Sequence, residues 1–275
     1  LVTLYALGSL LAAIPLTVAT QSLRRRPLLL TAVSGFIVAN TVTALSGDYL
    51  LTLAARFLAG VSAGLLWALI AGYAARMVKP SLKGRAISLA MVGTPLALSV
   101  GIPLGTFISG IIGWRSCFLA ISALSLLLIL WIAVSVPDFA AQPAAKRLPL
   151  SGVLRLPGVR SVLTSTLVFV LAHNILYTYI APFLQGVRMA DRISTVLLVF
   201  GVASLQGIWL VGITIDRWLR AGALLSTLLF ALAMVLLQWG GGSPAVIYTA
   251  VVLWGRAFGG AASLFQTALA KTADD

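Results

Sequence analysis

The sequence predicts an all-α polytopic membrane protein. Of its 275 residues, 60% are hydrophobic and only 9% are charged, whereas about a quarter of the residues of a soluble domain carry a charge. The mean hydropathy is +1.08. Nine apolar runs approach or exceed the ~20 residues that a bilayer-spanning helix needs. We expect spans at about 3–23, 28–46, 50–75, 86–112, 115–136, 161–184, 193–213, 221–239 and 245–268.

The basic residues between these spans predict which loops face the cytoplasm. Fourteen of the nineteen Lys and Arg residues lie on one alternating set of loops, whereas the other set carries only Arg115, Arg188 and Arg192. Because Lys and Arg accumulate on the cytoplasmic side of membrane proteins, the basic loops are predicted to be cytoplasmic. We therefore attribute the net charge of +13 to membrane topology and contact with the lipid bilayer, and we expect no nucleic-acid partner.

The sequence contains no motif for metal or catalytic chemistry. Its one cysteine, Cys117, lies in an apolar run, so neither a disulfide framework nor a zinc site is indicated. The single histidine, His173, falls inside a span, and no phosphate-binding loop of the GxxxxGK[ST] type occurs. We expect no cofactor, no metal and no enzymatic activity.

A stripe of small residues runs through the fourth span and the start of the fifth. Its members recur at every fourth position: Gly93, Ala97, Gly101, Gly105, Ser109 and Gly113. On a helix this spacing gives one smooth face, which in lipid lets two backbones approach closely. Pro95 and Pro103 interrupt the same run. We predict a helix that bends and that packs on the span at 193–213, through Gly201, Ser204 and Gly207.

The chain repeats itself weakly across a proline-rich loop. Arg56 is followed by Gly60 in the third span, and Arg256 is followed by Gly260 in the ninth, at an offset of 200 residues. The repeat unit is therefore six spans. It predicts three parts: an N-terminal half at 1–136, a cytoplasmic linker at 137–160 and a C-terminal half at 161–275. The same arithmetic predicts a fragment of a twelve-span protein, without its first, eleventh and twelfth helices.

Two motifs in the first half resemble those of the major facilitator superfamily, whose members are built from nested repeats. Residues 101–105 (GIPLG), followed by 113–115 (GWR), resemble the antiporter motif of the fifth helix. Residues 56–64, with the pattern RxxxGxxxG, resemble the fourth-helix motif of the drug:proton antiporter (twelve-spanner) family. The first of these motifs is typical of members that export their substrates.

Two motifs in the second half extend the resemblance. The superfamily's cytoplasmic loop motif is matched by Gly212, Asp216, Arg217 and Arg220. Residues 173–183 (HNILYTYIAPF) resemble the seventh helix of the arabinose-efflux-permease-like and purine-ribonucleoside-efflux-like group. The first-half copy of the loop motif lacks the Gly and Asp expected at about 16 and 20. The resemblance then implies a gate latch that is weak or that rests on Asp216 alone.

The resemblance implies a secondary transporter with the major facilitator fold and two pseudo-symmetric six-helix halves. It implies a multi-pass, monomeric protein of the bacterial inner membrane that exports a small drug, sugar or nucleoside by alternating access, coupled to protons. Two alternatives stay open. One is an uptake facilitator or symporter of the same fold, and the other is a transport-inactive membrane fragment or receptor. The identity of the substrate and of the coupling ion stays open as well.

Polar residues inside the apolar spans are the candidates for substrate binding and coupling. A charge at membrane depth is costly, so Arg56 and Arg256 are predicted to face a cavity or a partner. Snorkelling to the outer interface is the alternative for Arg56. His173, with Tyr177 one turn further on, is a candidate proton carrier, and a neutral histidine bonded to a neighbouring helix is the alternative. Further cavity candidates are Asn174, Gln206 and Trp209.

The distribution of acidic residues limits how protons could be exchanged. There is no glutamate, and all six aspartates fall in loops or at the end of the chain. Proton exchange would then rest on His173 or on a carboxylate of the missing first helix, and we favour the second. Asp216, Arg217 and Arg220 form a cytoplasmic charge cluster, which is predicted to act as an ion-pair gate between spans, with a solvated basic turn as the alternative. Two intramembrane arginines without an acid favour neutral or anionic substrates.

Overall fold

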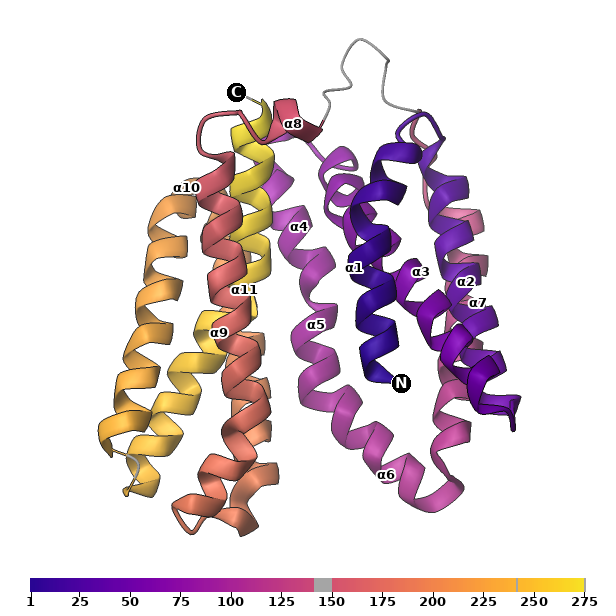
Figure 1. Ribbon diagram of the computed structural model, residues 1–275. Coiled ribbons are helices and arrows are strands. Elements are labelled where there is room, and N and C mark those ends of the chain that lie inside the picture. The colour runs from indigo at the N-terminus through magenta and orange to yellow at the C-terminus, as the bar shows by residue number, and fades with distance from the viewer. Residues whose placement is uncertain (141–149, 241, 275) are drawn as a thin grey trace. The chain divides into compact units, whose positions relative to one another are not determined.

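The computed structural model describes residues 1–140, 150–240 and 242–274, and every regular element in them is helical (Figure 1). The chain divides into two compact units. Unit 1 comprises Leu1–Tyr73 and Pro103–Arg147, and unit 2 comprises Ala74–Ile102 and Leu148–Asp275. This division differs from the predicted halves, because the segment Ala74–Ile102 makes its contacts within unit 2. The halves themselves, defined by the sequence repeat, stay a prediction.

Seven helices in the described residues are long and apolar enough to cross a membrane. The nine predicted spans map onto these residues with two differences. α10 (Ile193–Gly240) joins two predicted spans in one element of 48 residues, interrupted at Trp218 by non-helical φ and ψ angles of −123° and 32°. The predicted span at 86–112 is divided into short helices, none of which is long enough to span alone. An all-helical membrane protein is thus confirmed.

Unit 1 brings together the N-terminal helices and the helix that precedes the linker. Its elements are α1 (Val2–Ala19), α2 (Arg25–Leu45), most of α3 (Tyr49–Arg76), most of α6 (Ile102–Ile112), and α7 (Trp114–Ser135). Gly113, at the start of α7, has a φ of +84°, which only glycine adopts without strain. This glycine opens the GWR part of the antiporter-like motif, so its conformation explains the residue type. α7 is mostly exposed in the structure, as expected of a helix that faces lipid.

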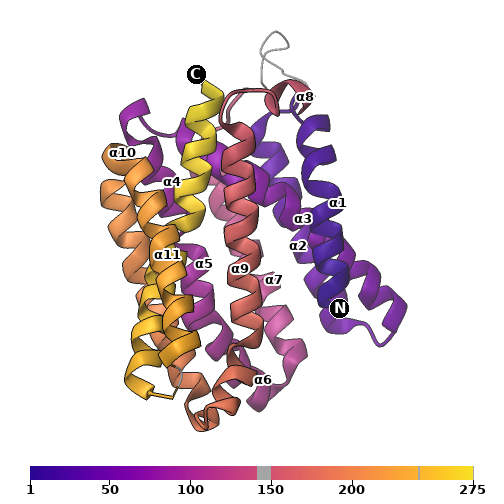
Figure 2. The ribbon, with the colours of Figure 1, turned by 60° about the vertical axis from the view of Figure 1, so that its left-hand side comes forward.

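Unit 2 is built around a helical hairpin. Its elements are α4 (Lys83–Met91), α5 (Gly93–Leu96), the π-helical turn η2 (Ala97–Gly101), α8 (Leu150–Val153), α9 (Val159–Gly186), α10 and α11 (Pro244–Asp274). The interruption at Trp218 divides α10 into a first arm before this residue and a second arm after it. Both arms pack on α11 (Figure 2). Residues 200–211 of the first arm pack parallel to residues 255–260 of α11. Residues 222–240 of the second arm pack antiparallel to residues 246–264, so the two arms are antiparallel to each other.

The packing of α1 on α3 is repeated by the first arm of α10 on α11. In each pair a Cβ added to a glycine would collide with a backbone carbonyl, which shows how closely the backbones approach. The contacts are Gly8 with Phe57, Gly60 with Tyr5, Gly207 with Arg256, and Gly259 with Ser204. The two residues of each contact in unit 2 lie 199 positions after the two residues of the matching contact in unit 1. The predicted offset of 200 is therefore wrong by one residue: Arg56 corresponds to Gly255, and Arg256 to Phe57.

The helix that carries the small-residue stripe is broken where the prolines predict a bend. The widened turn η2 lies directly before α6. Pro103 lacks an N–H group, and its ring excludes the carbonyl four residues earlier, which favours such a turn. The predicted packing partner is confirmed at the level of helices, since α5 and η2 contact α10. The residues predicted to form the contact are not confirmed, because Ser204 and Gly207 lie against α11. A Cβ added at Gly93 or Gly105 meets no described atom within 4 Å.

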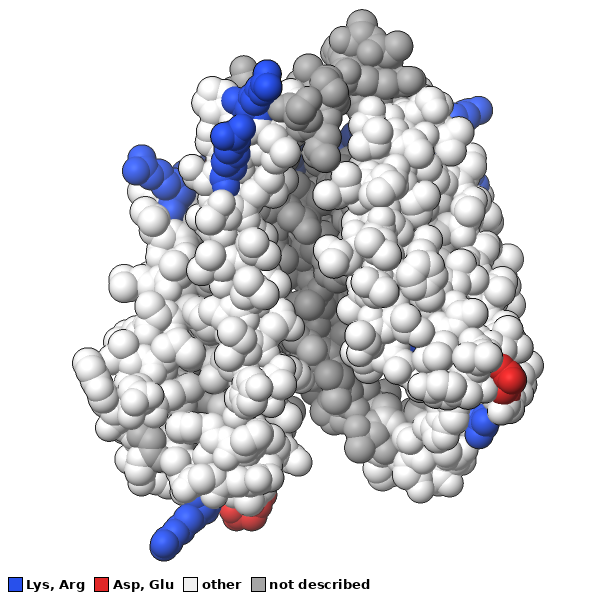
Figure 3. Space-filling model, in the orientation of Figure 1, with Lys and Arg blue, Asp and Glu red and all other residues white. Residues whose placement is uncertain are grey.

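The two units differ in how their interiors are filled. Unit 2 has a large aromatic and aliphatic core in which Trp254, Phe200 and Ile180 are at most 1% exposed. The buried cluster of unit 1 is smaller and consists of Leu28, Ala32, Leu65 and Leu69. Outside these cores, the visible flanks of the helices are uncharged and Lys and Arg gather toward the helix ends (Figure 3). This distribution suits helices whose flanks are in contact with lipid.

Candidate functional site

Arg56 is held inside unit 1 by neutral side chains. Its Nε donates to Thr43 Oγ1 at 3.0 Å, and its NH2 group donates to Asn40 Oδ1 at 2.7 Å. The guanidinium carbon lies 4.7 Å from the ring centre of Phe118, in cation–π geometry. The three partners come from α2 and α7, so one charged side chain ties three helices of the unit together.

The charge of Arg56 has no acidic partner in the described part of the chain. Arg56 lies seven residues after the start of α3, or about 10 Å along the axis at 1.5 Å per residue. Its side chain is half-buried rather than extended into a flat surface. A cation at this depth needs a polar environment, and Asn40 and Thr43 supply it without neutralising the charge. The charge of Arg56 is thus hydrogen-bonded but not neutralised by a carboxylate of the described residues.

Arg256 and Gln206 are the two candidate residues that the structure joins in unit 2. Both Nε and NH2 of Arg256 donate to Gln206 Oε1, at 3.2 and 3.1 Å. The pair connects α11 to the first arm of α10, and both side chains are exposed. Arg256 has no acidic partner in the described residues either. Its guanidinium therefore retains free N–H donors on an accessible face, which differs from the enclosed position of Arg56.

His173 lies in the aromatic core of unit 2, where it is 5% exposed. Trp254 Nε1–H donates to His173 Nδ1 at 3.1 Å, so this nitrogen accepts and the ring is neutral. The ring stacks on Phe258 at 3.6 Å between centroids and at an interplanar angle of 11°. Phe200 stacks at 5.9 Å. This arrangement fits the alternative prediction, a neutral histidine bonded to a neighbouring helix.

Of the remaining polar candidates of the second half, Tyr177 lies against His173, whereas Asn174 and Trp209 are exposed. Tyr177 is partly buried, with its ring 5.8 Å from that of His173. Asn174 is exposed and donates to the Val170 carbonyl of its own helix at 2.8 Å. Trp209 is 65% exposed on the first arm of α10. Their predicted role in substrate binding stays a prediction.

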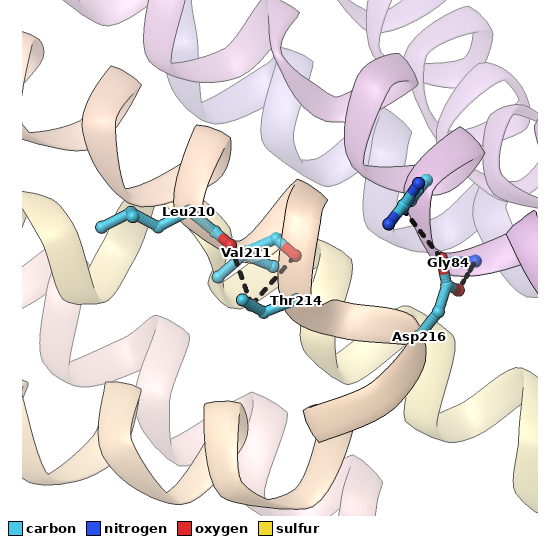
Figure 4. A network of polar contacts seen from close by, with 6 residues as sticks. Gly84, Leu210, Val211, Thr214 and Asp216 are labelled. Carbon is cyan, nitrogen blue, oxygen red and sulfur yellow. Dashed lines mark hydrogen bonds and ion pairs between the residues drawn. The ribbon is translucent and has the colours of Figure 1, made fainter.

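Asp216 binds the start of α4 rather than the arginines next to it in the sequence (Figure 4). Its Oδ1 accepts the backbone N–H of Gly84 at 2.9 Å, and Oδ2 lies 3.6 Å from Arg85 Nε. Arg217 and Arg220 are exposed. Asp216 thus forms an ion pair with an arginine of another helix, as an ion pair between spans requires. Asp216 ends the first arm on its α4 side, and the helix turns away at Trp218. The gating role of Asp216, Arg217 and Arg220 stays a prediction.

The contact of Asp216 with α4 is favourable because of where it occurs. The first amide groups of a helix lack intrahelical partners and carry partial positive charge. A carboxylate that accepts the second of these amides satisfies one donor and interacts with the helix dipole. A Cβ at Gly84 would lie 2.5 Å from Asp216 Oδ1 and 2.8 Å from Ile215, so glycine allows this approach. Gly212 lies one turn earlier, with Ser88 Cβ 3.7 Å from an added Cβ.

Unit 1 contains a similar carboxylate contact that the sequence did not reveal. Asp138, just after α7, accepts the backbone N–H of Arg26 at 3.0 Å and pairs with Arg24 Nε at 2.6 Å. Arg26 is the second residue of α2, as Gly84 is of α4. Tyr73 Oη donates to the Pro137 carbonyl at 2.5 Å and so holds the same segment on α3. Asp138 thus binds a helix start in unit 1, as Asp216 does in unit 2.

Several residues of these sites were not identified from sequence, although signals for them exist. The polar run Asn40-Thr41-x-Thr43 inside an apolar span would have indicated partners for Arg56. Asp138 is one of six acidic residues and follows Pro137 directly. The stretch Lys146–Arg147 of the predicted linker lies outside the described residues. Of Pro103, only the backbone is described here, so its proposed role in gating stays a prediction.

The chain is similar to several bacterial proteins. It is 27% identical over 281 residues to a probable sugar efflux transporter of Mannheimia succiniciproducens, covering 100% of the chain and 70% of that protein. It is 31% identical to the transcription regulatory protein OpdE of Pseudomonas aeruginosa, covering 85% and 60%. It is 28% identical to the purine ribonucleoside efflux pump NepI of Escherichia coli, covering 94% and 65%. The chain thus spans about 60–70% of the length of these relatives.

A solved structure and a family model agree with the fold. The human organic anion transporter MFSD10 superposes with a TM-score of 0.77 at 18% identity, over 96% of this chain and 67% of that one. A likeness at this identity shows the fold alone. The model of the Major Facilitator Superfamily matches residues 1–275. With its paired helical packing, its GIPLG and RxxxGxxxG motifs and this match along the whole length, the chain belongs to the Major Facilitator Superfamily.

Proposed function

We propose that the chain forms part of a secondary efflux transporter for small polar molecules. The observation that carries the proposal is Arg56, a half-buried membrane arginine whose partners Asn40 and Thr43 are neutral. An uncompensated cation at this depth is costly, and a substrate that carries oxygen acceptors or negative charge offsets that cost. Family membership and relatives named as efflux proteins support export.

The proposed substrate class is neutral polar or anionic. Arg56 in unit 1 and Arg256 in unit 2 both retain N–H donors, and neither has a carboxylate partner in the described residues. A cationic drug would be repelled by both groups, whereas a sugar or a nucleoside presents hydroxyl and carbonyl oxygens. The names of two relatives, a sugar efflux transporter and a purine ribonucleoside pump, agree with this class.

Export is proposed to be driven by proton exchange across a bacterial inner membrane, by a monomer whose basic loops face the cytoplasm. The neutral, buried state of His173 makes it a poor proton carrier, because Trp254 occupies the nitrogen that would gain a proton. A carboxylate near Arg56 would be better placed, since a neighbouring cation stabilises its ionised form. Asp216 and its contact with α4 are proposed as one element of the cytoplasmic gate.

Uptake into everted membrane vesicles tests this proposal. Vesicles that contain the protein are given an acidic interior, and labelled sugar or nucleoside is added outside. Efflux activity appears as accumulation of labelled substrate inside these vesicles, and collapse of the proton gradient should abolish it. Accumulation only in right-side-out vesicles would favour the symporter alternative, and no accumulation in either orientation would favour a receptor.

A further inference from the structure

The proposed function leaves the GWR motif at residues 113–115 without a role. Trp114 and Arg115 occupy the first turn of α7, directly after Gly113 with its positive φ. The NH2 group of Arg115 donates to the Ser46 carbonyl at the end of α2, at 3.2 Å. Carbonyl groups at the C-terminus of a helix carry partial negative charge, so a cation is favourable there. The motif thus attaches the start of α7 to the end of α2.

A second bond attaches α7 to α2 two helical turns further along. Thr41 Oγ1 donates to Ser122 Oγ at 3.0 Å, and Ser122 is buried. Phe118 lies between the two attachment points, three residues after Arg115 and four before Ser122. Because positions three and four apart share a face of a helix, Phe118 lies on the face of α7 that both bonds hold against α2.

A series of ring contacts connects the motif to Arg56. The guanidinium carbon of Arg115 lies 4.5 Å from the ring centre of Trp114. Trp114 meets Phe118 edge to face, with 5.8 Å between the ring centres and 87° between the planes. The guanidinium carbon of Arg56 lies over the ring of Phe118, at 4.7 Å from its centre. Since the face of an aromatic ring attracts a cation, the series ends in a favourable contact with Arg56.

The guanidinium of Arg56 is held from α2 at the same time. Its Nε and NH2 groups donate to Thr43 and Asn40, which lie one turn apart on that helix. Both acceptors are at most 4% exposed, so packing fixes their positions. The N–H groups of a guanidinium lie in one plane, so two such bonds restrict its orientation, and Phe118 adds a third contact from α7. A lysine has no planar fork with which to make the same contacts.

We propose that Phe118 is a positioning residue for Arg56, and that the GWR motif holds Phe118 in place. The inference rests on the proposed role of Arg56 in transport and assigns to Phe118 a part in that role. The ring does not have to touch the substrate. A cation that is already held in one orientation loses little side-chain freedom when it binds, which favours binding. All the contacts that carry this inference lie within unit 1.

Export by a set of single and double variants tests the proposal. Phe118→Leu should reduce the initial rate about tenfold, whereas Phe118→Tyr keeps the ring and should stay within about twofold of the wild type. Arg56→Lys keeps the charge without the planar fork and should lose about tenfold or more. Because Phe118 acts through Arg56, adding Phe118→Leu to Arg56→Lys should change the rate by less than about twofold. A further tenfold loss in that background would show a merely structural ring and would overturn the proposal.

A second measurement does not depend on transport. Phenylglyoxal modifies arginine, and mass spectrometry of the purified full chain gives its rate at Arg56 relative to exposed Arg188. The relative rate should rise severalfold in Phe118→Leu and stay unchanged in Phe118→Tyr and in Trp131→Leu, which removes an exposed ring from the same helix.

The labelling separates the two ways in which the proposals could fail. The expected labelling pattern in a protein that exports nothing would contradict the proposed function and still support the placement of Arg56 by Phe118. Unchanged labelling of Arg56 in folded Phe118→Leu would overturn that placement, whatever the transport rate. Phe118→Met, which conserves most of the side-chain volume, replaces the leucine variant if that variant does not fold.

Discussion

The α1–α3 pair of unit 1 and its counterpart in unit 2 share their backbone packing and differ in their chemistry. In both pairs glycines press against backbone carbonyls, at a constant offset of 199 residues. The arginines do not follow this symmetry, because Arg256 aligns with Phe57 and Arg56 with Gly255. One residue is about 100° around a helix. This rotation is why Arg56 reaches Asn40 and Thr43, whereas Arg256 is exposed beside Gln206.

The difference teaches which features of the repeat are structural. Close approach of two helices in lipid requires small residues at fixed positions, so glycine positions are retained where the backbones touch. Charged groups need only a suitable environment, and the two units provide different ones. The same holds for the carboxylates Asp138 and Asp216, which reach equivalent helix positions from unrelated parts of the chain.

The strongest test of the shared packing is to add one methyl group at the contact. Gly60→Ala and Gly259→Ala each drive a Cβ into a backbone carbonyl and should destabilise the protein by about 3 kcal/mol or more. The measure is the thermal transition in detergent. Gly72→Ala, in open space on α3, is the control and should be neutral or slightly stabilising. Equal effects at Gly60 and Gly72 would show that the contact is not close.

Substitution of Arg56 and of Arg256 should have different effects when stability and transport are measured on the same variants. Arg56→Ala leaves Asn40 and Thr43 without their partner, and it should cost about 1–3 kcal/mol and reduce transport at least tenfold. Arg256→Ala should reduce transport severalfold with little loss of stability, because its pair is exposed. Initial rates in proteoliposomes and thermal melting provide the two readouts. Arg188→Ala is the control for loss of one charge, and normal transport by both variants would contradict the assigned site.

The aromatic core of unit 2 has no counterpart in the buried cluster of unit 1, and one bond tests its role. Trp254→Phe removes the donor to His173 Nδ1 but keeps the ring packing, so it should cost about 0.5–1.5 kcal/mol. Transport and its pH dependence should be unchanged, because the histidine is structural. The check is a pH–rate profile beside the melting curve. A shifted pH–rate profile would contradict this and would indicate that His173 carries protons.

The two carboxylate contacts should give the smallest effects. Asp138→Asn and Asp216→Asn keep an acceptor for the helix amide but remove the charge, which should cost about 0.3–1 kcal/mol each. Hydrogen exchange should accelerate at Arg26 in the first variant and at Gly84 in the second. Asp191→Asn, which removes an exposed pair with Arg192, is the control. Acceleration at both helix starts in either single variant would mean that the contacts are not independent.

The sequence by itself determined the class of protein, the approximate spans and the break at Pro103. Length of apolar run, scarcity of charge and proline chemistry act locally, so they are readable without a fold. Four motifs were sufficient to indicate the family. The sequence also brought Gln206 and Arg256 into one set of candidates, and the structure joins them.

Tertiary structure alone decided which groups meet. The partner of Asp216 is separated from it by more than 130 residues, and that of Asp138 by 112. The glycine contacts repeat at an offset of 199 residues, whereas the two arginines repeat at an offset of 200. A repeat that is matched by residue type alone does not reveal this difference of one residue. His173 is a core residue because Trp254 and Phe258 enclose it. Side-chain environment depends on which helix faces pack, and packing is settled by contacts that lie far apart in the chain.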